Sequence, residues 1–328
     1  MFKTPVKSSI VLKKILKIIN NLQPYSLKFL GKKLEISTLY IFNIINKLKM
    51  YGISINVTSN YLQIKESLIL LDENKIMNKS YFKNYKVKTY ESISSTNDYF
   101  FFSKLNKSLP YFCFAEFQEL GRGSLGRFWE SDYGKNITFS FSYFLNRNIE
   151  SISSLSLVIS ISIIESLNIL YKIRHLKLKW PNDVYLNEAK ISGNIINIKN
   201  KDNDSCEVII GIGLNVNMDV KSDIKINQRW ASLKQKLKKD LDRNILIDIL
   251  INIILKNLYL FNNKGFSGFI RFWNKFDFLR GKYICILQFS KIFFGYSVGV
   301  NQKGHLCIKD LTGKINNYSS GNIILIKN

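Results

Sequence analysis

The chain has 328 residues, and its 48 lysines and arginines against 24 aspartates and glutamates give a net charge of +24. This length leaves room for about two or three domains. A hydrophobic fraction of 46% is that of an ordinary globular protein and excludes disorder over most of the chain. No run approaches the roughly 18 uncharged apolar residues of a membrane span, so we expect a soluble, cytoplasmic chain without a membrane partner.

The net charge and the cysteines limit the possible binding partners of the chain only in part. A strongly basic chain suits a nucleic-acid partner, but lysine is spread along the whole sequence together with isoleucine and asparagine, which share AT-rich codons. Both origins of the charge stay open. Scattered cysteines without a C-x-x-C pair argue against structural zinc and a disulfide framework. The residues concerned are Cys113, Cys206, Cys285, Cys307, His175 and His305.

The N-terminal segment has the pattern of a winged helix-turn-helix. Apolar residues at helical spacing predict three helices, and alternation predicts two short strands around a turn at Ser59 and Asn60. Ser37 suits the N-cap of the third helix, which should end near Gly52. The helices are expected over 10–19, 26–34 and 37–50, the strands over 53–57 and 61–64, and the inward side chains at Leu39, Ile41, Phe42, Ile45 and Leu48.

The rest of the chain divides into two further parts. The middle mixes strand-like runs with two long helical ones, as in an α+β domain of about two hundred residues. After Phe276 short strands broken by glycines indicate a small antiparallel barrel. The domains are therefore expected over 1–66, 67–276 and 277–328. The clearest strands are expected over 111–117, 137–143, 176–180 and 208–216, and the helices over 152–171 and 245–261.

The densest cluster of polar and small residues is the run 115–129. Gly121, Gly123 and Gly126 alternate there with Arg122 and Arg127. Backbone N–H groups freed by such glycines, beside guanidinium groups, form an anion-binding concavity. The G-x-G-x-x-G match is weak support for a dinucleotide site, because no helix opening or βαβ unit follows. A plain turn is the remaining alternative.

Two more segments combine strands with polar ends. Along 175–187, alternation places Leu176 and Leu178 on one face and Lys177 and Lys179 on the other, and Pro181 ends the strand. The lysine can neutralise a phosphate or carboxylate, and Asp183 can hold Mg²⁺. An ordinary β-turn at Asn182 and Asp183 is the alternative interpretation.

The run 208–217 is a predicted buried strand with two glycines, Gly211 and Gly213. Either a ligand or plain packing could require them. Upstream, the run 94–98 could be no more than a helix N-cap.

Together these motifs resemble the biotin protein ligase family, of the bifunctional ligase and biotin-operon repressor type. The resemblance covers the whole chain, and the motifs occur in the family's order and spacing. They are Ser95-Thr96-Asn97, Gln118, the loop from Gly121 to Arg127, Lys179-Trp180-Pro181-Asn182-Asp183, Lys190 to Gly193, and Gly211 to Val216.

The resemblance implies a fold and an activity. It implies a class II synthetase-like catalytic domain between the winged helix-turn-helix and an SH3-like barrel. Biotin and ATP would form biotinyl-5′-adenylate with Mg²⁺, and the biotinyl group would pass to a lysine of the biotin carboxyl carrier protein of acetyl-CoA carboxylase. Repressor-type members also dimerise when they carry the adenylate, so a ligand-induced homodimer is expected. Lipoate ligation, on a related fold, is the less favoured alternative.

The resemblance also assigns roles to residues. Lys190, Arg122 and Asp183 would be catalytic, with Lys190 at the biotin carboxylate, where its fixed charge orients the nucleophile, and Asp183 on Mg²⁺. Biotin would be bound by Ser95, Thr96, Asn97, Gln118, Arg122, Gly123, Ser124 and Lys190. ATP and the adenylate would be bound by Gly121, Arg127, Lys179, Asn182, Asn215 and Trp230.

Two departures from the family pattern stand out. Repressor-type ligases usually carry two arginines where this chain has Ser124 and Leu125, so we expect the adenylate to be held less tightly. Asn194 replaces an expected aliphatic residue after Gly193.

The sequence of the N-terminal segment leaves DNA binding open. The recognition helix would offer Ser37, Thr38, Tyr40 and Asn43, with no basic residue before Lys47. The predicted wing, 57–60, is short. Two hypotheses therefore stay open: an enzyme that also represses transcription from operator DNA, or a ligase whose DNA-binding module is vestigial.

Overall fold

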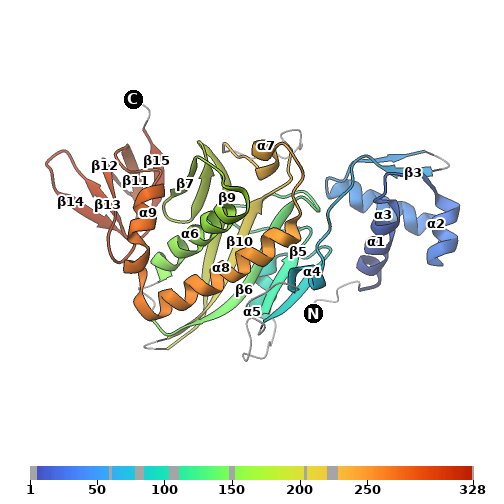
Figure 1. Ribbon diagram of the computed structural model, residues 1–328, viewed down its shortest axis with the longest axis horizontal. Coiled ribbons are helices and arrows are strands. Elements are labelled where there is room, and N and C mark those ends of the chain that lie inside the picture. Colours follow the sequence, from blue (N-terminus) through green and yellow to red (C-terminus); the bar gives the residue numbers. More distant parts are fainter. Residues whose placement is uncertain are drawn as a thin grey trace.

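The computed structural model describes residues 6–58, 61–77, 85–102, 111–147, 152–202, 205–219 and 228–326. Figure 1 shows three parts along the long axis: a helical N-terminal part, a large central α+β part, and a C-terminal sheet. The turn expected at Ser59 and Asn60 lies outside the described residues.

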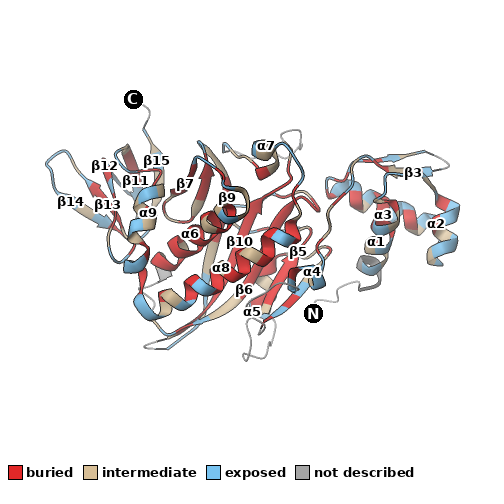
Figure 2. Cartoon of the chain, viewed as in Figure 1, coloured by how far each residue is buried: buried red, intermediate tan, exposed pale blue. Residues whose placement is uncertain are grey.

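The N-terminal part packs three helices against a small sheet of order β1-β3-β2. Two of the helices begin with serine caps: Ser26 accepts from the Phe29 amide, and Ser37 accepts from the Tyr40 amide at 3.2 Å. Figure 2 shows buried residues on their inner faces only. The elements are α1 (Val6–Ile19), β1 (Tyr25–Ser26), α2 (Leu27–Leu34), α3 (Thr38–Met50), β2 (Ile55–Val57) and β3 (Tyr61–Ile64).

The predicted inward face of α3 was partly wrong. Ile41, Ile45 and Leu48 are buried as expected, but Leu39 is 72% exposed and Phe42 is 37% exposed. Ile44 is buried in their place. At about 100° per residue, the stripe that contains 41, 44, 45 and 48 leaves 39 and 42 on the outer face.

The central part is a seven-stranded sheet of order β4-β5-β6-β10-β9-β8-β7. Among the strands that the structure describes in this sheet, only the pair β4 and β5 is parallel. The strands are β4 (Lys86–Tyr90), β5 (Tyr111–Ala115), β6 (Asn136–Leu145), β7 (Leu176–Lys179), β8 (Asp183–Leu186), β9 (Ala189–Lys201) and β10 (Cys206–Asn215). The helices are α4 (Glu73–Met77), α5 (Thr96–Phe102), α6 (Ile152–Tyr171), α7 (Leu233–Leu237), α8 (Arg243–Lys264) and α9 (Ile270–Phe276).

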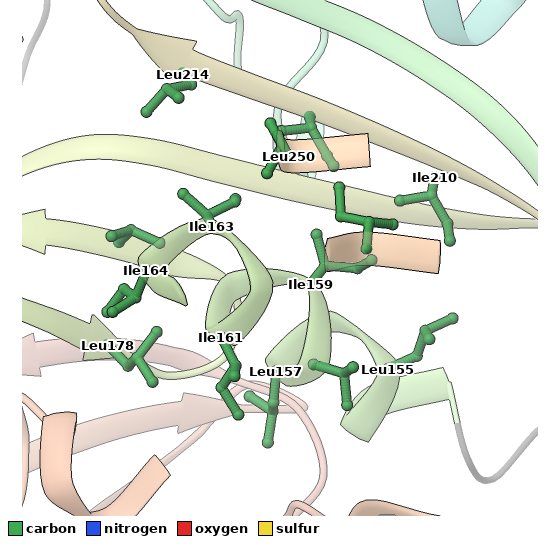
Figure 3. Packing of buried hydrophobic residues seen from close by; sticks show 14 of the residues in the cluster. Leu155, Leu157, Ile159, Ile161, Ile163, Ile164, Leu178, Ile210, Leu214 and Leu250 are labelled. Atoms are coloured by element: carbon green, nitrogen blue, oxygen red, sulfur yellow. The ribbon is translucent and has the colours of Figure 1, made fainter. Parts of the chain in front are cut away.

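Helices α6 and α8 cover one face of this sheet, and α5 packs on the other. Figure 3 shows how the leucine and isoleucine side chains of α6 pack between the sheet and its neighbours. Phe112 and Phe114 of β5 join this large core, whereas Cys113 between them joins a smaller cluster with Phe100 of α5. Alternation along the strands therefore separates two layers of side chains.

Both long helices are apolar enough to raise the question of a membrane. By length and composition α6 and α8 could each cross one, which the sequence analysis did not anticipate. In each, however, 67% of the most apolar window is buried inside the protein. Core helices of a globular domain have this property, so the two helices do not indicate a membrane protein.

The C-terminal part is a five-stranded antiparallel sheet of order β14-β13-β12-β11-β15. It joins the central part closely, because the Trp180 indole N–H donates to the carbonyl of Gly304 at 3.1 Å. Gly304 has φ +76°, and a Cβ there would lie 2.7 Å from Cβ of Ser154 on α6, so only glycine fits this junction. The strands are β11 (Tyr283–Gln288), β12 (Lys291–Val300), β13 (Leu306–Lys309), β14 (Ile315–Tyr318) and β15 (Asn322–Leu325).

A buried ion pair links distant segments of the central part. The side chains of Arg243 and Glu116 are 0% and 2% exposed, and Nη2 of Arg243 lies 2.7 Å from Oε2 of Glu116. Arg243 also donates to the backbone carbonyls of Asn136 and Ile69. Paired and hydrogen-bonded in this way, the two charges can remain buried.

Candidate active site

A pocket opens on the sheet face opposite α6 and α8. Ile210, Ile212 and Leu214 of β10 belong to the core beneath those helices, so the alternating Gly211 and Gly213 face the other way and line the pocket. The pocket holds about 430 Å³ of empty space, part of it open to solvent. Its walls come from α5, the loop after β5, and strands β6, β9 and β10.

One wall of the pocket consists of polar side chains that are hydrogen-bonded to one another. Oε1 of Gln118 accepts from the Thr96 backbone amide at 2.8 Å and from the Thr96 hydroxyl at 3.0 Å. Oγ1 of Thr96 also lies 2.8 Å from Oγ of Ser140. Because these bonds occupy the Gln118 oxygen, the amide presents its NH₂ donors to a ligand.

Asn97 forms the neighbouring wall. Its Nδ2 donates to Oδ1 of Asn197 at 2.9 Å, while its buried Oδ1 has no hydrogen-bond partner among the described residues. A Cβ on Gly211 would lie 2.9 Å from that oxygen, so glycine makes room for it. A buried acceptor without a partner is disfavoured unless a ligand or water supplies a donor.

The loop from Gly121 to Trp129 folds back on itself. The Gly123 amide donates to the carbonyl of Arg127 at 2.7 Å, and the Trp129 amide donates to that of Gly121 at 3.0 Å. Between them lies a single 3₁₀ turn, Ser124–Gly126. The loop thus opens no α-helix, and the glycine pattern is not a dinucleotide fingerprint.

Trp129 closes this loop over the sheet. A Cβ on Gly213 would lie 2.3 Å from Cε2 of its indole, so the glycine serves close packing of the ring. The buried Nε1 of Trp129 has no hydrogen-bond partner within the described ranges. Trp129 is a pocket residue at the end of the run 115–129, and no role was expected for it.

Lys190 and Asp183 form an ion pair at the far side of the pocket. Nζ of Lys190 lies 2.7 Å from Oδ1 of Asp183 and 5.7 Å from the centre of the Trp129 ring. Both side chains are largely buried, at 13% and 17% exposed. A Cβ on Gly193 would approach both charged groups, so glycine leaves space beside them.

Further positive charges surround this pair. Burial lowers the pKa of Lys179, the charges of Lys190, Arg127 and Lys282 act in the same direction, and the Asp183 carboxylate opposes them. Nζ of Lys179 lies 3.3 Å from the hydroxyl of Tyr185, whose pKa is raised by burial and then by Asp183. Such a concentration of cations suits a polyanion.

The two loop arginines are held by neighbouring groups. Nη2 of Arg122 pairs with Oδ2 of Asp98 at 2.9 Å, and its side chain is 61% exposed. Nη2 of Arg127 donates to Oδ1 of Asn322 on β15 at 3.0 Å, which connects the loop to the C-terminal sheet.

The structure brings most of the expected site residues together. The pocket is lined by Ser95, Thr96, Asn97, Gln118, Arg122, Gly123, Ser124, Asn182 and Lys190. The other expected residues, Gly121, Arg127, Lys179, Asp183, Asn215 and Trp230, are not in its lining. The pocket residues that carried no expected role include Trp129, Ser140 and Asn194.

Trp230 lies in a second hollow, with Glu188, Arg229 and Lys236. It is nevertheless joined to the site through the backbone, because the Ala231 amide donates to the carbonyl of Lys190 at 3.0 Å. Nδ2 of Asn215 donates to the carbonyl of Ala231 in turn.

Comparison with known proteins gives this fold and pocket a family. Residues 89–215 match the biotin/lipoate A/B protein ligase family. The bifunctional ligase/repressor BirA of Escherichia coli is 30% identical over 321 residues, which cover 98% of each chain, and that of Salmonella typhimurium is 30% identical over 90% of this chain and 91% of its own. The structure of Aquifex aeolicus biotin protein ligase in complex with biotin and ATP superposes with a TM-score of 0.62 at 29% identity, covering 74% of this chain and 99% of that one.

The site combines a polar pocket with a cationic rim, which consists of Arg122, Arg127, Lys179 and Lys190. Together with the α+β catalytic fold, it defines a ligase of the biotin and lipoate class. The chain belongs to this family, among the BirA-like biotin protein ligases. Its enzymatic activity is that of a biotin protein ligase.

Proposed function

We propose that the pocket binds biotin by its ureido ring and activates its carboxylate with ATP. The observation that carries this is the pair of complementary groups in the wall, the Gln118 amide donor and the unpartnered Asn97 oxygen. A ureido group offers a carbonyl acceptor and two N–H donors, so it satisfies both. Ser95 and Thr96 complete this end of the site. Analogues without the ureido polar groups would leave Asn97 buried and unpaired, which favours their rejection.

The cationic rim is the proposed place of the ATP phosphates. Arg127 and Lys179 would bind the phosphate oxygens. Gly121 would contact the adenylate, whereas Arg122, Gly123 and Ser124 would border both biotin and the adenylate. The carboxylate of Asp183 fits Mg²⁺, which commonly takes one or two protein carboxylates and completes its shell with phosphate oxygens and water. When bound, the metal would offset phosphate charge. No cluster of three or more His, Cys, Asp or Glu side chains occurs in the described part of the chain, so a metal cage made by protein alone is not proposed.

Lys190 is the proposed catalytic residue. Its ammonium group would bind the biotin carboxylate, orient one oxygen toward the α-phosphorus of ATP, and stabilise the charge that develops there. The new phosphorus–oxygen bond displaces pyrophosphate. The ε-amine of an acceptor lysine then attacks the acyl carbon, and AMP leaves with the electron pair of the broken bond. Asn182, Asn215 and Trp230 would hold the nucleotide on the side of the second hollow.

Transfer of labelled biotin to a purified biotin carboxyl carrier domain, with ATP and Mg²⁺, tests these roles. Lys190→Ala should reduce transfer by at least about a hundredfold, because positioning and charge stabilisation are lost together. Lys201→Ala, an exposed lysine on the same strand, is the matched control and should transfer normally. Biotin transfer by Lys190→Ala at the rate of the wild type would refute the assignment. Acceptance of lipoate in a parallel reaction would instead show a changed substrate.

We propose operator DNA binding by a winged helix-turn-helix, residues 1–66, as a second function. Support comes from α3, whose N-terminal half is solvent-exposed at Ser37, Thr38 and Asn43, with Tyr40 half-buried. The relatives are also named as ligases and repressors. The exposed Leu39 and Phe42, however, place apolar rather than basic side chains on the same face. The DNA phosphates would be attracted by the lysines of this part, which are Lys28, Lys32, Lys33, Lys47 and Lys49.

Fluorescence anisotropy with a two-half-site operator, with and without biotin plus ATP, separates repression from a vestigial module. A repressor should bind the operator more tightly than a scrambled duplex, and Asn43→Ala should relax this preference. Equal, salt-sensitive binding to both duplexes would remove the repressor role. The proposal includes association into a homodimer on ligand binding, measurable by sedimentation in the same mixtures. It also includes a cytoplasmic location and an SH3-like C-terminal domain over 277–328, after a catalytic domain over 67–276.

A further inference from the structure

Asn194 belongs to the floor of the pocket, but its side chain lies on the far face of the strand. Its side chain is 2% exposed, and its neighbour across the sheet is Ile212, which faces the core beneath α6 and α8. The adjacent Gly193 and Ile195 face the pocket instead. A substitution at 194 therefore chiefly changes the packing and hydrogen bonding beneath the pocket floor.

The Asn194 side chain is fully engaged with helix α6. Its Oδ1 accepts from the Ser156 hydroxyl at 2.6 Å. Its Nδ2 donates to Oγ of Ser160 at 2.9 Å and to the carbonyl of Ser156 at 3.2 Å. In a buried setting such a satisfied network fixes one arrangement of its members.

The same amide reaches the turn that carries Asp183. Nδ2 of Asn194 donates to the carbonyl of Asn182 at 3.2 Å, and Nδ2 of Asn182 donates to the carbonyl of Asn194 at 2.7 Å. The Asn194 backbone amide donates to the Asn182 carbonyl as well. The residue after Asn182 is Asp183, which pairs with Lys190.

We propose that Asn194 is a positioning residue that anchors the Asn182–Asp183 turn to α6 and thereby holds Asp183 opposite Lys190. The inference rests on the proposed function of the Lys190 and Asp183 pair. An aliphatic side chain at 194 could fill the space but could not join the two elements. The chain thus has a hydrogen-bonded anchor at the position where the resemblance leads us to expect an aliphatic side chain.

The test compares Asn194→Leu with the wild type in biotin adenylation, measured as the burst of pyrophosphate followed by turnover. The burst amplitude counts active sites, so the rate per site separates positioning from partial unfolding. We expect the rate per site to fall at least about tenfold, because a misplacement of about 1 Å can already cost about a hundredfold in rate. A reduced amplitude with an unchanged rate per site would show a merely structural role and overturn the proposal.

A second variant keeps the inference testable if Asn194→Leu folds poorly. The Ser156 hydroxyl loses its acceptor in Asn194→Leu, whereas the Ser160 hydroxyl keeps its bond to the Ser156 carbonyl. Replacing Ser156 by alanine in the Asn194→Leu background removes the unpaired hydroxyl group, so the melting temperature should recover toward that of the wild type. The rate per site should stay reduced, since the anchor is still missing. Recovery of rate together with melting temperature would refute the positioning role. Ser166→Ala, a buried serine further along α6 that bonds only within the helix, is the control and should leave both values unchanged.

The outcomes distinguish failure of this inference from failure of the proposed function. If the wild type and Ser166→Ala adenylate biotin and Asp183→Asn is slowed, but Asn194→Leu matches the wild type, only the positioning role is wrong. If Asp183→Asn also retains the full rate per site, the assigned role of the ion pair is wrong, and the positioning role falls with it.

Discussion

Gly213 offers a direct test of the pocket geometry. In Gly213→Ala the added methyl carbon would lie 2.3, 2.6 and 2.7 Å from three atoms of the Trp129 indole. Carbon atoms pack at about 3.5–4.0 Å, so the ring must move by about 1 Å or more. The backbone around Gly213 is a regular strand between β6 and β9, which cannot shift without disturbing both neighbours.

The displaced indole should affect both stability and function. Overpacking of this kind reduces the free energy of unfolding by about 1–3 kcal/mol. The Trp129 ring lies beside Lys190, so a shift of about 1 Å should lower the adenylation rate on the order of a hundredfold. Stability would be measured by urea unfolding and activity by pyrophosphate release.

Gly268→Ala is the matched control, because nothing lies within 4 Å of the position of its Cβ and its φ is not positive. This variant should match the wild type in both assays. If Gly213→Ala adenylates biotin as fast as Gly268→Ala, then the close packing of Trp129 on the strand does not shape the site, and the reasoning is refuted.

Three further predictions concern charge. Arg243→Met should lower the free energy of unfolding by about 3–5 kcal/mol, because Glu116 would be left charged and buried. Adding Glu116→Leu should restore part of this loss. A loss below about 1 kcal/mol in urea unfolding of the single variant would contradict the prediction. Lys179→Met should abolish adenylation yet stabilise the fold at neutral pH, because the lowered pKa of Lys179 means that burying its charge is unfavourable. The unfolded chain binds more protons than the folded one just below pH 10.5, so the gain in melting temperature should shrink as pH rises through that window and not grow. Ser124→Arg with Leu125→Arg should slow release of biotinyl-5′-adenylate on the order of tenfold in a stopped-flow chase, and an unchanged off-rate would dismiss the effect of the missing arginines.

Much of the fold could be predicted because its main elements carry local signals. The apolar runs that become α6 and α8, and the alternation of Leu176 and Leu178 in β7, are readable from periodicity alone. Helix α8 extends two residues before and three beyond the predicted 245–261, since its N-cap Asp242 and C-terminal Gly265 set its ends. Ends fixed by caps outside the apolar pattern are missed by periodicity.

Strand β9 and the role of Asn194 could not be predicted in this way. Residues 189–201 are rich in lysine and asparagine, which have low strand propensity, and the strand exists because it pairs with β10 on one side and β8 on the other. Likewise the role of Asn194 depends on hydrogen bonds to serines about forty positions earlier, which the local sequence does not reveal. The sequence also left Gly211 and Gly213 open between ligand and packing, and only the positions of Asn97 and Trp129 explain them.

The link between Arg243 and Glu116 bears on how the chain is made. The two residues are 127 positions apart. At a synthesis rate of about 5–20 residues per second, Glu116 leaves the ribosome roughly 6 to 25 s before its partner. During that interval the end of β5 carries a carboxylate that has no guanidinium to bury it. The Glu116 carboxylate can therefore be buried as an ion pair only after the start of α8 has been made, which couples completion of this part of the core to the late C-terminal half of the chain.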